Sequence, residues 1–499
     1  MKKIIIIGSG IGGLTAGNLL AKKGHDVTIF ESHSMPGGYT AGFMRKGFYF
    51  ESGTLSFEAS ASVNKAMKDI GISDKVTFVP QRLRFVSDNI DGSPENYNDF
   101  KNMFYSGFSN EKDKLDKFFA ELDKMAVILS SFDKPMPFLF NGLPYLFSVL
   151  PFIFKGPKMV KTMGSYEGLT TSEFLLKFFE KDSKLYNWFK GFGYPDMAAY
   201  NLAGAATSMF SDYWTVKDGM QSWADALAAN FRKSGGKLLL NSYVEKIITK
   251  DSLATGVLCN NRKYQSDYVI AACDYKNAIL KLLDNKDIIP LEMRERIKNS
   301  PVSEGFFTVY LGLKMPADEL KKYMQLPHVM FFDEKEGLDI YNSEDEEYFD
   351  KNSVSLYSPS MINPKHAPVG KTSLMLQTTV PYRWMENWGA GDKQRYKVLK
   401  EKAMDSMIKK ASKLIPDLQE HIEFKEAATP LTYERYTHNS DGASSSWSWN
   451  PRKKFFDNAM SVNVNTPVKN LYIGSCWSMQ IGGIPGALAG AYQSAKNIK

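Results

Sequence analysis

Three glycines close to the start of the chain are spaced to bring a phosphate group against the backbone. Gly8, Gly10 and Gly13 match the pattern G-x-G-x-x-G, in which the glycines allow a tight turn, close approach of a pyrophosphate and close packing of a helix on a strand. An acid about 20 residues further on binds the ribose, and Glu31 stands there. The set predicts a dinucleotide site that repels a 2′-phosphate. A purely structural glycine turn is the alternative.

The residues around these glycines predict the elements that hold them in place. Ile4–Ile7 form a continuous apolar run, which is typical of a strand buried on both faces. We expect a helix from about Ile11 to Lys23 and a second strand over DVTIF, just before Glu31. The order strand, turn, helix and strand predicts a Rossmann-like α/β fold.

A second group of glycines follows directly, in the stretch MPGGYTAGFMRKGFYFESG. Gly37 and Gly38 form a pair after the acid, and Gly47 and Gly53 enclose a short aromatic strand. A nicotinamide-binding protein would continue here with alternating helices and strands. So many glycines instead favour FAD, a long ligand that lies along the main chain, although an irregular glycine loop is the alternative.

The last segment of the chain has the features of another binding turn. The sequence LYIGSCWSMQIGGIPGALAGAYQSA, residues 471–495, predicts a strand that ends at Gly474, a glycine-rich turn and a helix of small residues. The N-terminus of such a helix attracts an anion or a cofactor. The chain therefore carries binding features at both ends.

Together these segments resemble the FAD-dependent amine oxidase and phytoene desaturase superfamily. The closer similarity is to the branch that contains bacterial phytoene desaturases, plant carotenoid isomerase and retinol saturase. Residues 218–247, 266–274 and 428–443 resemble further segments of that branch. The resemblance implies that one FAD spans both ends of the chain, with its ADP half at the first glycine turn and its flavin ring at the last helix.

The resemblance and the glycine motif together assign a set of residues to FAD. These residues are Gly8, Gly10, Ile11, Gly12, Gly13, Glu31, Ser32, Gly37, Gly38, Tyr39, Gly53, Val244, Gly474, Ser475, Gly483 and Ile484. Val244 would offer its backbone to the adenine. Two positions depart from the family: Tyr39 replaces an arginine, and Ser475 replaces an acid that would bind the ribityl chain more strongly.

The same resemblance implies a discontinuous domain organisation within an α/β fold. Residues 1–80, 205–285 and 425–499 would form a Rossmann-like FAD-binding domain of the glutathione-reductase type. An inserted α+β substrate domain would take its sheet from residues 81–109 and 286–424, with strands over 77–88, 304–314 and 372–380. Residues 110–204 would form a helical, apolar lid.

Residues 134–161 are the most apolar part of the predicted lid. No charge occurs from Leu143 to Phe154, but a helix of that length reaches only about 18 Å, against roughly 30 Å for a bilayer core. Four prolines would break a helix here: Pro135, Pro137, Pro144 and Pro151. Four lysines flank the uncharged stretch: Lys134, Lys155, Lys158 and Lys161. It predicts either peripheral membrane contact or a buried lid, and both give an apolar entrance.

Composition excludes several other classes of protein. The net charge of +7 comes from dispersed Lys and Arg, so nucleic acid is not an expected partner. The three cysteines and six histidines form no ligand spacing, so no metal site is predicted. The lysines and isoleucines at the N-terminus resemble a signal peptide, but glycines interrupt them. We expect a cytoplasmic protein, with peripheral attachment to the inner face of the membrane as an alternative.

The expected function is that of an FAD-dependent oxidoreductase. By resemblance, it would desaturate, saturate or isomerise carbon–carbon bonds of an apolar polyene or isoprenoid lipid, with hydride transfer to or from flavin N5. Tyr433, Arg435 and His438 are weak candidates for moving a proton, and Trp447 and Trp449 are candidate walls of an apolar tunnel. The electron partner is not indicated. The alternatives are a flavin amine oxidase and a non-enzymatic prenyl-lipid carrier similar to the Rab GDP-dissociation inhibitors.

Overall fold

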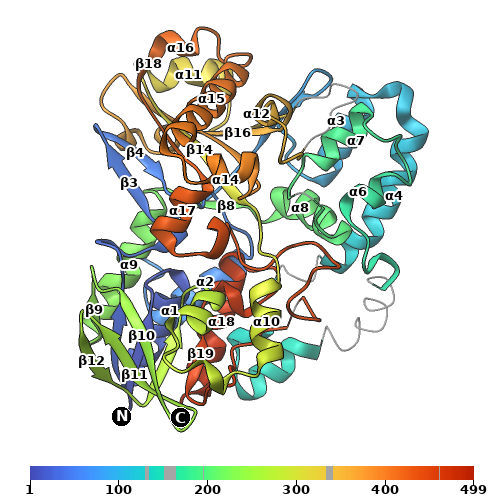
Figure 1. Cartoon of the computed structure of the whole chain (residues 1–499). Helices are drawn as coiled ribbons and strands as arrows, with labels where there is room; N and C mark the ends of the chain where they lie inside the picture. Colours follow the sequence, from blue (N-terminus) through green and yellow to red (C-terminus); the bar gives the residue numbers. More distant parts are fainter. Residues whose placement is uncertain (130–133, 151–163, 195, 333–340, 460) are drawn as a thin grey trace.

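The computed structural model describes residues 1–129, 134–150, 164–194, 196–332, 341–459 and 461–499. Figure 1 shows three lobes: a lower lobe that holds both termini, an upper lobe built on a large sheet, and a helical lobe beside them. Segments from the beginning, middle and end of the chain meet in the lower lobe.

A parallel five-stranded sheet forms the centre of the lower lobe, in the order β19-β13-β1-β2-β9. Its strands are β1 (Lys3–Ile7), β2 (Asp26–Phe30), β9 (Lys237–Leu239), β13 (Tyr268–Ala271) and β19 (Leu471–Ile473). Ile4 and Ile6 enter one core, and Ile5 and Ile7 enter another on the opposite face. The apolar run at the start of the chain is therefore a strand buried on both faces, as predicted.

The two faces of this sheet are covered by different layers. Four helices pack on one face: α1 (Ile11–Lys22), α2 (Ser60–Ile70), α9 (Met220–Lys233) and α18 (Gly483–Asn497). A three-stranded antiparallel sheet packs on the other: β10 (Val244–Lys250), β11 (Leu253–Cys259) and β12 (Arg262–Gln265). Helix α10 (Leu291–Asn299) lies beside this second layer. The predicted Rossmann-like α/β architecture is confirmed.

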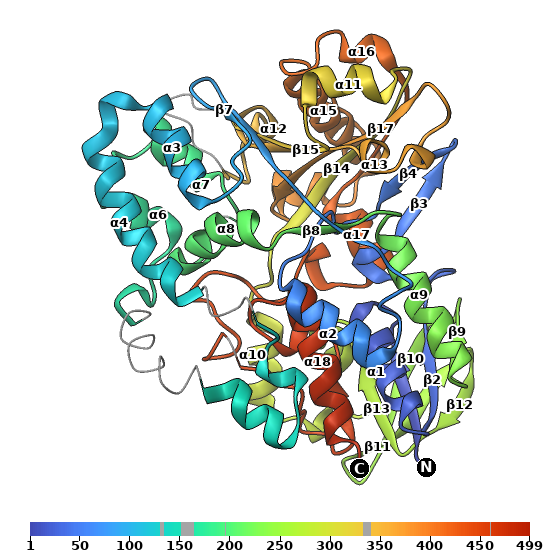
Figure 2. The same cartoon turned by 180° about the vertical axis from the view of Figure 1, so that it is seen from behind.

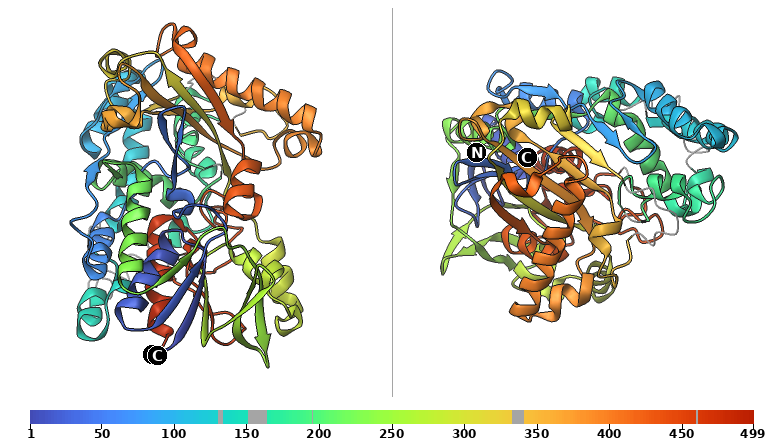
Figure 3. Two further views of the ribbon diagram at one scale, coloured as in Figure 1. Left: turned by 90° about the vertical axis from the view of Figure 1, so that its left-hand side faces the viewer. Right: turned by 90° about the horizontal axis from the view of Figure 1, so that it is seen from above.

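A seven-stranded sheet forms the upper lobe, in the order β18-β14-β17-β16-β15-β6-β7. The strands are β6 (Arg84–Val86), β7 (Asp91–Gly92), β14 (Gly305–Leu313), β15 (His328–Phe331), β16 (Val354–Tyr357), β17 (Thr372–Val380) and β18 (Ile422–Ala428). Helices α11 (Ala317–Met324) and α15 (Lys393–Ala411) pack against one face of the sheet, as Figure 3 shows for the long α15. The other elements of this lobe are α12 (Tyr348–Lys351), α13 (Pro359–Ile362), α14 (Trp384–Ala390) and α16 (Leu418–His421).

The helical lobe has an aromatic core that is continuous with one end of the large sheet. Its helices are α3 (Tyr97–Gly107), α4 (Lys112–Leu129), α6 (Thr171–Leu175), α7 (Lys184–Lys190) and α8 (Ala199–Ser211), seen from behind in Figure 2. Trp188 meets Phe104 edge to face at 4.6 Å between ring centroids and stacks on Phe332 at 4.2 Å. Phe332 follows β15, so the helices are fixed to the upper lobe.

Short elements connect the three lobes around a common centre. They are the hairpin β3 (Gly42–Arg45) and β4 (Phe48–Glu51), the pair β5 (Phe78–Pro80) and β8 (Trp214–Val216), and helix α17 (Pro430–Thr437). The predicted strand over residues 77–88 was wrong as a single element. Its first part pairs with β8, and only its second part enters the seven-stranded sheet, because Phe78 and Phe85 belong to separate cores.

Two predicted domain limits also need correction. The limit at residue 425 falls inside β18, whose residues pair with β14 up to Ala428. Residues 134–140 were assigned to the lid, but they pack on the lower lobe, where Lys496 Nζ donates to the carbonyls of Phe138 and Phe140 at 2.6 and 2.7 Å. Only the part up to residue 150 of the predicted apolar segment lies within the described residues.

Candidate active site

A cavity of about 1560 Å³ lies where the three lobes meet. Its lower part is lined by the glycine turn after β1 and by the turn before α18, and its upper part by residues of the helical lobe and the seven-stranded sheet. A pocket for one small ligand commonly measures roughly 300–1,000 Å³. This cavity therefore has room for a large ligand together with a second molecule.

The two ends of the chain are in direct contact beneath this cavity. Figure 2 shows α1 and α18 side by side, in agreement with their contacts. The Gly474 N–H donates to the Ala271 carbonyl at 2.9 Å. A Cβ atom at Gly12 would overlap the Gly474 carbonyl oxygen, so the first turn of α1 lies against the end of β19. Helices α1 and α18 both begin at this cavity, and neither has a capping side chain within the described chain.

Gly10 leaves an open space beside the N-terminus of α1. Its φ of −66° is one that any residue adopts, and the nearest atom to a Cβ there would be the Gly37 carbonyl oxygen at 3.9 Å. Neither the backbone nor the packing of the protein itself requires a glycine at this position. Because Gly10 lines the cavity, the space suits a pyrophosphate, which the N–H groups and dipole of the helix would attract.

Glu31 is held in the cavity wall by backbone donors. Its carboxylate accepts hydrogen bonds from the Ser9 N–H at 2.8 Å, the Ser9 hydroxyl at 2.7 Å and the His33 N–H at 2.9 Å. It comes directly after β2, at the carboxyl end of the parallel sheet, and lines the cavity. This is the position at which a ribose is bound in Rossmann-like folds.

The second glycine pair lies next to the first glycine turn. The Gly37 N–H donates to the Ser9 carbonyl at 3.0 Å. Tyr39 stands where the resembling family has an arginine, and its hydroxyl donates to the Gly442 carbonyl at 3.0 Å. Its ring stacks on that of Tyr433, with 5.5 Å between the ring centroids. Its polar contact is therefore made to the C-terminal part of the chain itself.

Ser475 makes a contact that the sequence did not indicate. Its hydroxyl donates to the Cys273 carbonyl at 2.7 Å, so it links the end of β19 to the end of β13 while it lines the cavity. The Gly483 N–H donates to the Ser445 hydroxyl at 3.0 Å. The turn before α18 is thus fixed by Ser445 and Ser446, whose hydroxyls also donate to the carbonyls of Ile481 and Met479.

All the residues assigned to FAD line this one cavity except Gly13 and Gly474. Those two glycines lie behind it, where a Cβ atom would overlap the Gly8 carbonyl oxygen and the Ile270 side chain respectively. Val244 lines the cavity at the start of β10 and is buried. Whether each residue touches the cofactor stays a prediction.

The three weak candidates for proton transfer differ in how they lie relative to the cavity. Tyr433 is buried behind Tyr39 and shares hydrogen bonds with Thr308 and Tyr310; burial raises the pKa of its phenol. Arg435 and His438 line the cavity, and burial lowers the pKa of the His438 imidazole.

Arg435 and His438 have neighbours at the nucleotide end of the cavity. The ring centroids of His438 and Tyr243, the residue before Val244, are 5.1 Å apart, and the Arg435 guanidinium lies over the ring of Tyr436. Of the two tryptophans, Trp449 lines the cavity, whereas Trp447 is a buried core residue stacked on Phe455.

The upper part of the cavity combines apolar walls with a few polar side chains that the sequence did not reveal. Its apolar and aromatic lining includes Met197, Tyr200, Met209, Phe306, Met330 and Trp449. The polar side chains include Glu58, Asp212 and His328. Burial raises the pKa of Glu58 to about 7 and lowers that of His328 to about 3. No motif marks these residues, because they come from three separate segments.

A family model described as "Flavin containing amine oxidoreductase" matches residues 11–499. The chain belongs to this family. It is therefore an FAD-dependent oxidoreductase, and both the predicted cofactor and the predicted enzyme class are confirmed. The open space at Gly10, the uncapped helix termini and the acid after β2 fit FAD.

Similar proteins of named activity place this flavin oxidoreductase within its family. Prolycopene isomerase 2 from an Oncidium hybrid cultivar is 28% identical, covering 88% of this chain and 74% of that protein. The 4,4′-diapophytoene desaturase of Methylomonas sp. is 25% identical, covering 91% of this chain and 88% of that protein. The all-trans-retinol 13,14-reductase of Danio rerio is 25% identical, covering 98% of this chain and 84% of that protein. The resemblance to the desaturase, isomerase and saturase branch is confirmed.

Solved structures confirm the fold. An oxidoreductase from Methanosarcina mazei superposes with a TM-score of 0.64 at 15% identity, covering 99% of this chain and 100% of that one. Putrescine oxidase bound to putrescine superposes with a TM-score of 0.63 at 14% identity, covering 100% and 98%.

The structure also bears on two expected absences. Among the described residues, no group of His, Cys, Asp or Glu side chains is arranged to hold a metal ion. No helix in the described part of the chain is both long and apolar enough to cross a membrane.

Proposed function

We propose that this flavin oxidoreductase acts on carbon–carbon bonds of an apolar polyene or isoprenoid lipid. The observation that carries the proposal is the continuity of one large cavity from the glycine turn into an upper part with apolar and aromatic walls. Bound FAD supplies hydride transfer, and the protein orients the substrate. Support comes from the relatives, whose names refer to prolycopene, 4,4′-diapophytoene and retinol.

The proposed position of FAD follows the wall of the cavity from one glycine turn to the other. Its ADP half would lie along Gly8–Gly12 with the ribose at Glu31 and Ser32 and the adenine at Val244. Its flavin end would lie between Gly53 and the turn of Ser475, Gly483 and Ile484. There the dipole of α18 would stabilise negative charge on the reduced ring, by up to about 2 kcal/mol.

Anaerobic mixing with candidate substrates tests the proposed function. The oxidised, FAD-loaded protein is mixed with 4,4′-diapophytoene, prolycopene, all-trans-retinol or putrescine, and the reduced protein with the same polyenes. We expect at least one polyene to change the flavin absorbance or to be converted, while putrescine has no effect. Bleaching by amines alone would identify an amine oxidase, and a protein that cannot bind FAD at all would favour the carrier.

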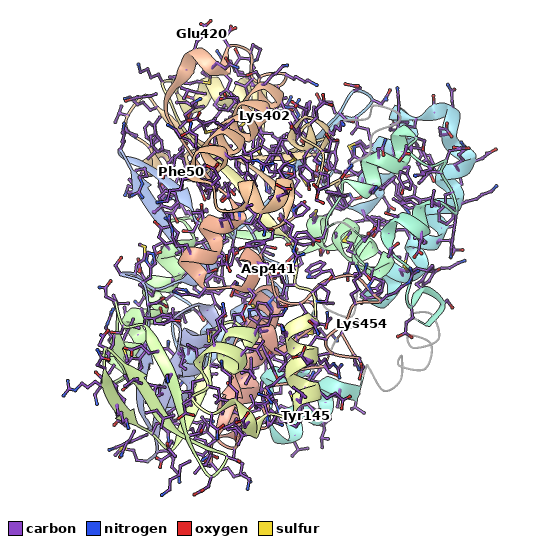
Figure 4. The ribbon with its side chains drawn as sticks, viewed as in Figure 1. Phe50, Tyr145, Lys402, Glu420, Asp441 and Lys454 are labelled. Atoms are coloured by element: carbon purple, nitrogen blue, oxygen red, sulfur yellow. The ribbon has the colours of Figure 1, made fainter. Side chains whose placement is uncertain are left out.

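We also propose that an exposed apolar helix attaches the protein to a lipid surface. Residues 142–150 are helical, and Leu143, Leu146 and Phe147 are 67%, 58% and 66% exposed. Figure 4 shows Tyr145 of this helix at the lower edge of the molecule, far from Glu420 of the upper lobe. Met136, which precedes this helix by only a few residues in the sequence, lines the cavity. The helix is therefore close in sequence to the cavity wall.

The membrane proposal predicts that a double change in this helix releases the protein from vesicles. Leu146→Glu with Phe147→Glu removes two apolar side chains from the bilayer, a loss of about 3 kcal/mol and roughly 100-fold in vesicle affinity. The measurement is co-sedimentation with phosphatidylcholine vesicles, with and without phosphatidylglycerol. Leu291→Glu, at an equally exposed leucine of α10, is the control and should bind like wild type. Equal binding by the double variant would refute the proposal.

A further inference from the structure

Glu58 is directed into the cavity by the backbone on both sides of it. Phe57 pairs with Trp214 through N–H to carbonyl bonds of 2.8 and 2.9 Å, and the Phe57 ring is buried in the core of the lower lobe. Two residues later, the Ser60 N–H donates to the Asp212 carboxylate at the start of α2. Glu58, held between these two anchored positions, lines the cavity.

The Glu58 carboxyl has its own backbone N–H as its hydrogen-bond partner. No side chain of the described residues donates a hydrogen bond to it, whereas the nearby Asp212 is bonded to Ser60 and to the Trp214 indole at 2.9 Å. A partly buried carboxyl without a side-chain or charged partner is costly, and such groups concentrate at sites where they react or bind.

The titratable groups that line the upper part of the cavity include Asp212 and Tyr213 after α8, Tyr194 after α7, and His328 on β15. Lys101 of α3 also lines the cavity, but its ammonium is paired with the Asp123 carboxylate at 3.2 Å, and no cation of the described residues contributes to the pKa of Glu58. The Tyr194 hydroxyl is paired with Ser444, and the His328 ring with Ser355. His328 is uncharged at neutral pH because burial lowers its pKa to about 3. Burial and the charge of Asp212 together raise the pKa of Glu58 to about 7.

Two other carboxyls also have a raised pKa, but neither lines the cavity. Glu51 accepts hydrogen bonds from the Tyr49 hydroxyl at 2.8 Å and from the Met220 N–H at 3.1 Å, so it fixes the β4 strand to α9. Burial raises the pKa of Glu304 to about 7, like that of Glu58, but Glu304 is not among the residues that line the cavity. Glu58 alone among these three faces the space where a substrate would lie.

We propose that Glu58 is the catalytic residue that moves the proton during the reaction on the polyene, an inference that rests on the proposed function. In the oxidising direction a Glu58 carboxylate oxygen would take the proton of one substrate carbon, while bound FAD would supply the acceptor for a hydride from the adjacent carbon. The electrons of the C–H bond that loses the proton would form the new C=C bond, so the substrate would lose two electrons to the flavin. In the reducing direction Glu58 returns the proton, and an isomerisation uses both steps.

The test compares Glu58→Gln with Glu304→Gln in the FAD-loaded protein. With the polyene that wild type converts, we expect kcat of Glu58→Gln to fall by roughly 100- to 10,000-fold with little change in KM. Glu304→Gln should stay close to wild type. The kcat of wild type should rise through a pH of about 7 in the oxidising direction, since the carboxylate takes the proton, and fall there in the reducing direction. Glu58→Asp, which keeps the acid, should restore part of the rate and the pH dependence.

A second measurement requires no substrate. Infrared difference spectra of FAD-loaded wild type should show the C=O band of a protonated carboxyl that disappears as the pH rises through about 7. Because the pKa of Glu304 is also about 7, part of this band should remain in Glu58→Gln, Glu304→Gln should keep the part that belongs to Glu58, and only the double variant should lack both. An unchanged kcat in Glu58→Gln, or an unchanged band, overturns the role of Glu58. If wild type converts none of the polyenes, the proposed function fails instead, and with it the substrate named for this step. Circular dichroism confirms that each variant is folded.

Discussion

Gly10→Ala is expected to fold like wild type and to bind FAD about 10- to 100-fold more weakly. Alanine is compatible with the backbone of Gly10, and its Cβ would meet no protein atom closer than the Gly37 carbonyl oxygen at 3.9 Å. It would occupy the space proposed for the pyrophosphate, and such overpacking costs typically 1–3 kcal/mol. The measurements are a flavin fluorescence titration of the apoprotein and its thermal midpoint without FAD.

Gly24→Ala is the matched control, because it should lower the stability of the protein without changing its affinity for FAD, the opposite of what is expected for Gly10→Ala. Gly24 has a φ of +83° after α1, with nothing within 4 Å of a Cβ atom. Alanine there is strained by about 1 kcal/mol, so the thermal midpoint should fall while the affinity for FAD stays the same. If Gly10→Ala instead destabilised the apoprotein and left FAD binding intact, the space beside Gly10 would not be the pyrophosphate site.

Gly12→Ala, only two residues further along the same motif, should damage the fold itself. Its Cβ would overlap the Gly474 carbonyl oxygen, which is backbone and cannot rotate away. The substitution would push α1 away from the end of β19, with an expected loss of about 3 kcal/mol in the free energy of unfolding. The apoprotein should therefore unfold at a lower urea concentration, in contrast to Gly10→Ala.

The result for Gly12→Ala is informative in both directions. A stable apoprotein with wild-type unfolding would mean that the opening turn and the closing strand are not in contact as described. Loss of stability with and without FAD would support the direct contact between the two ends of the chain.

The lower lobe was predictable because its signals are local and strong. The glycine spacing and the apolar run Ile4–Ile7 predicted β1, α1 and β2 to within about two residues at each end, and the small residues near the end of the chain predicted the helix α18. The long strands at 305–313 and 372–380 were predictable for the same reason, since both are rich in β-branched and aromatic residues.

The remaining features depend on contacts between distant segments, which no single stretch of sequence contains. Residues 77–88 divide between two sheets because their two partners, β8 and β15, lie far along the chain. Residues 134–140 lie on the lower lobe through Lys496, near the very end of the chain. Glu58 lies beyond the glycine-rich stretch of residues 35–53 and in no motif, and its place in the cavity wall depends on the pairing of Phe57 with Trp214.

The catalytic candidates show the same limit. Tyr433, Arg435 and His438 were chosen because they precede the flavin segment in the sequence, and proximity along the chain does not decide which part of the site a residue reaches. The structure instead puts Tyr433 behind Tyr39 and His438 beside Tyr243. Only the three-dimensional arrangement separates the nucleotide end of the cavity from its upper, apolar end.

A crystal structure of the FAD-loaded protein tests the central claim most directly, namely that one cofactor is held by both ends of the chain. We predict continuous density for FAD with its ribose hydroxyls within hydrogen-bonding distance of Glu31, its pyrophosphate beside Gly10 and its ring against Gly483 and Ile484. Density for the cofactor in another part of the molecule, or a ring that makes no contact with the turn before α18, would contradict it.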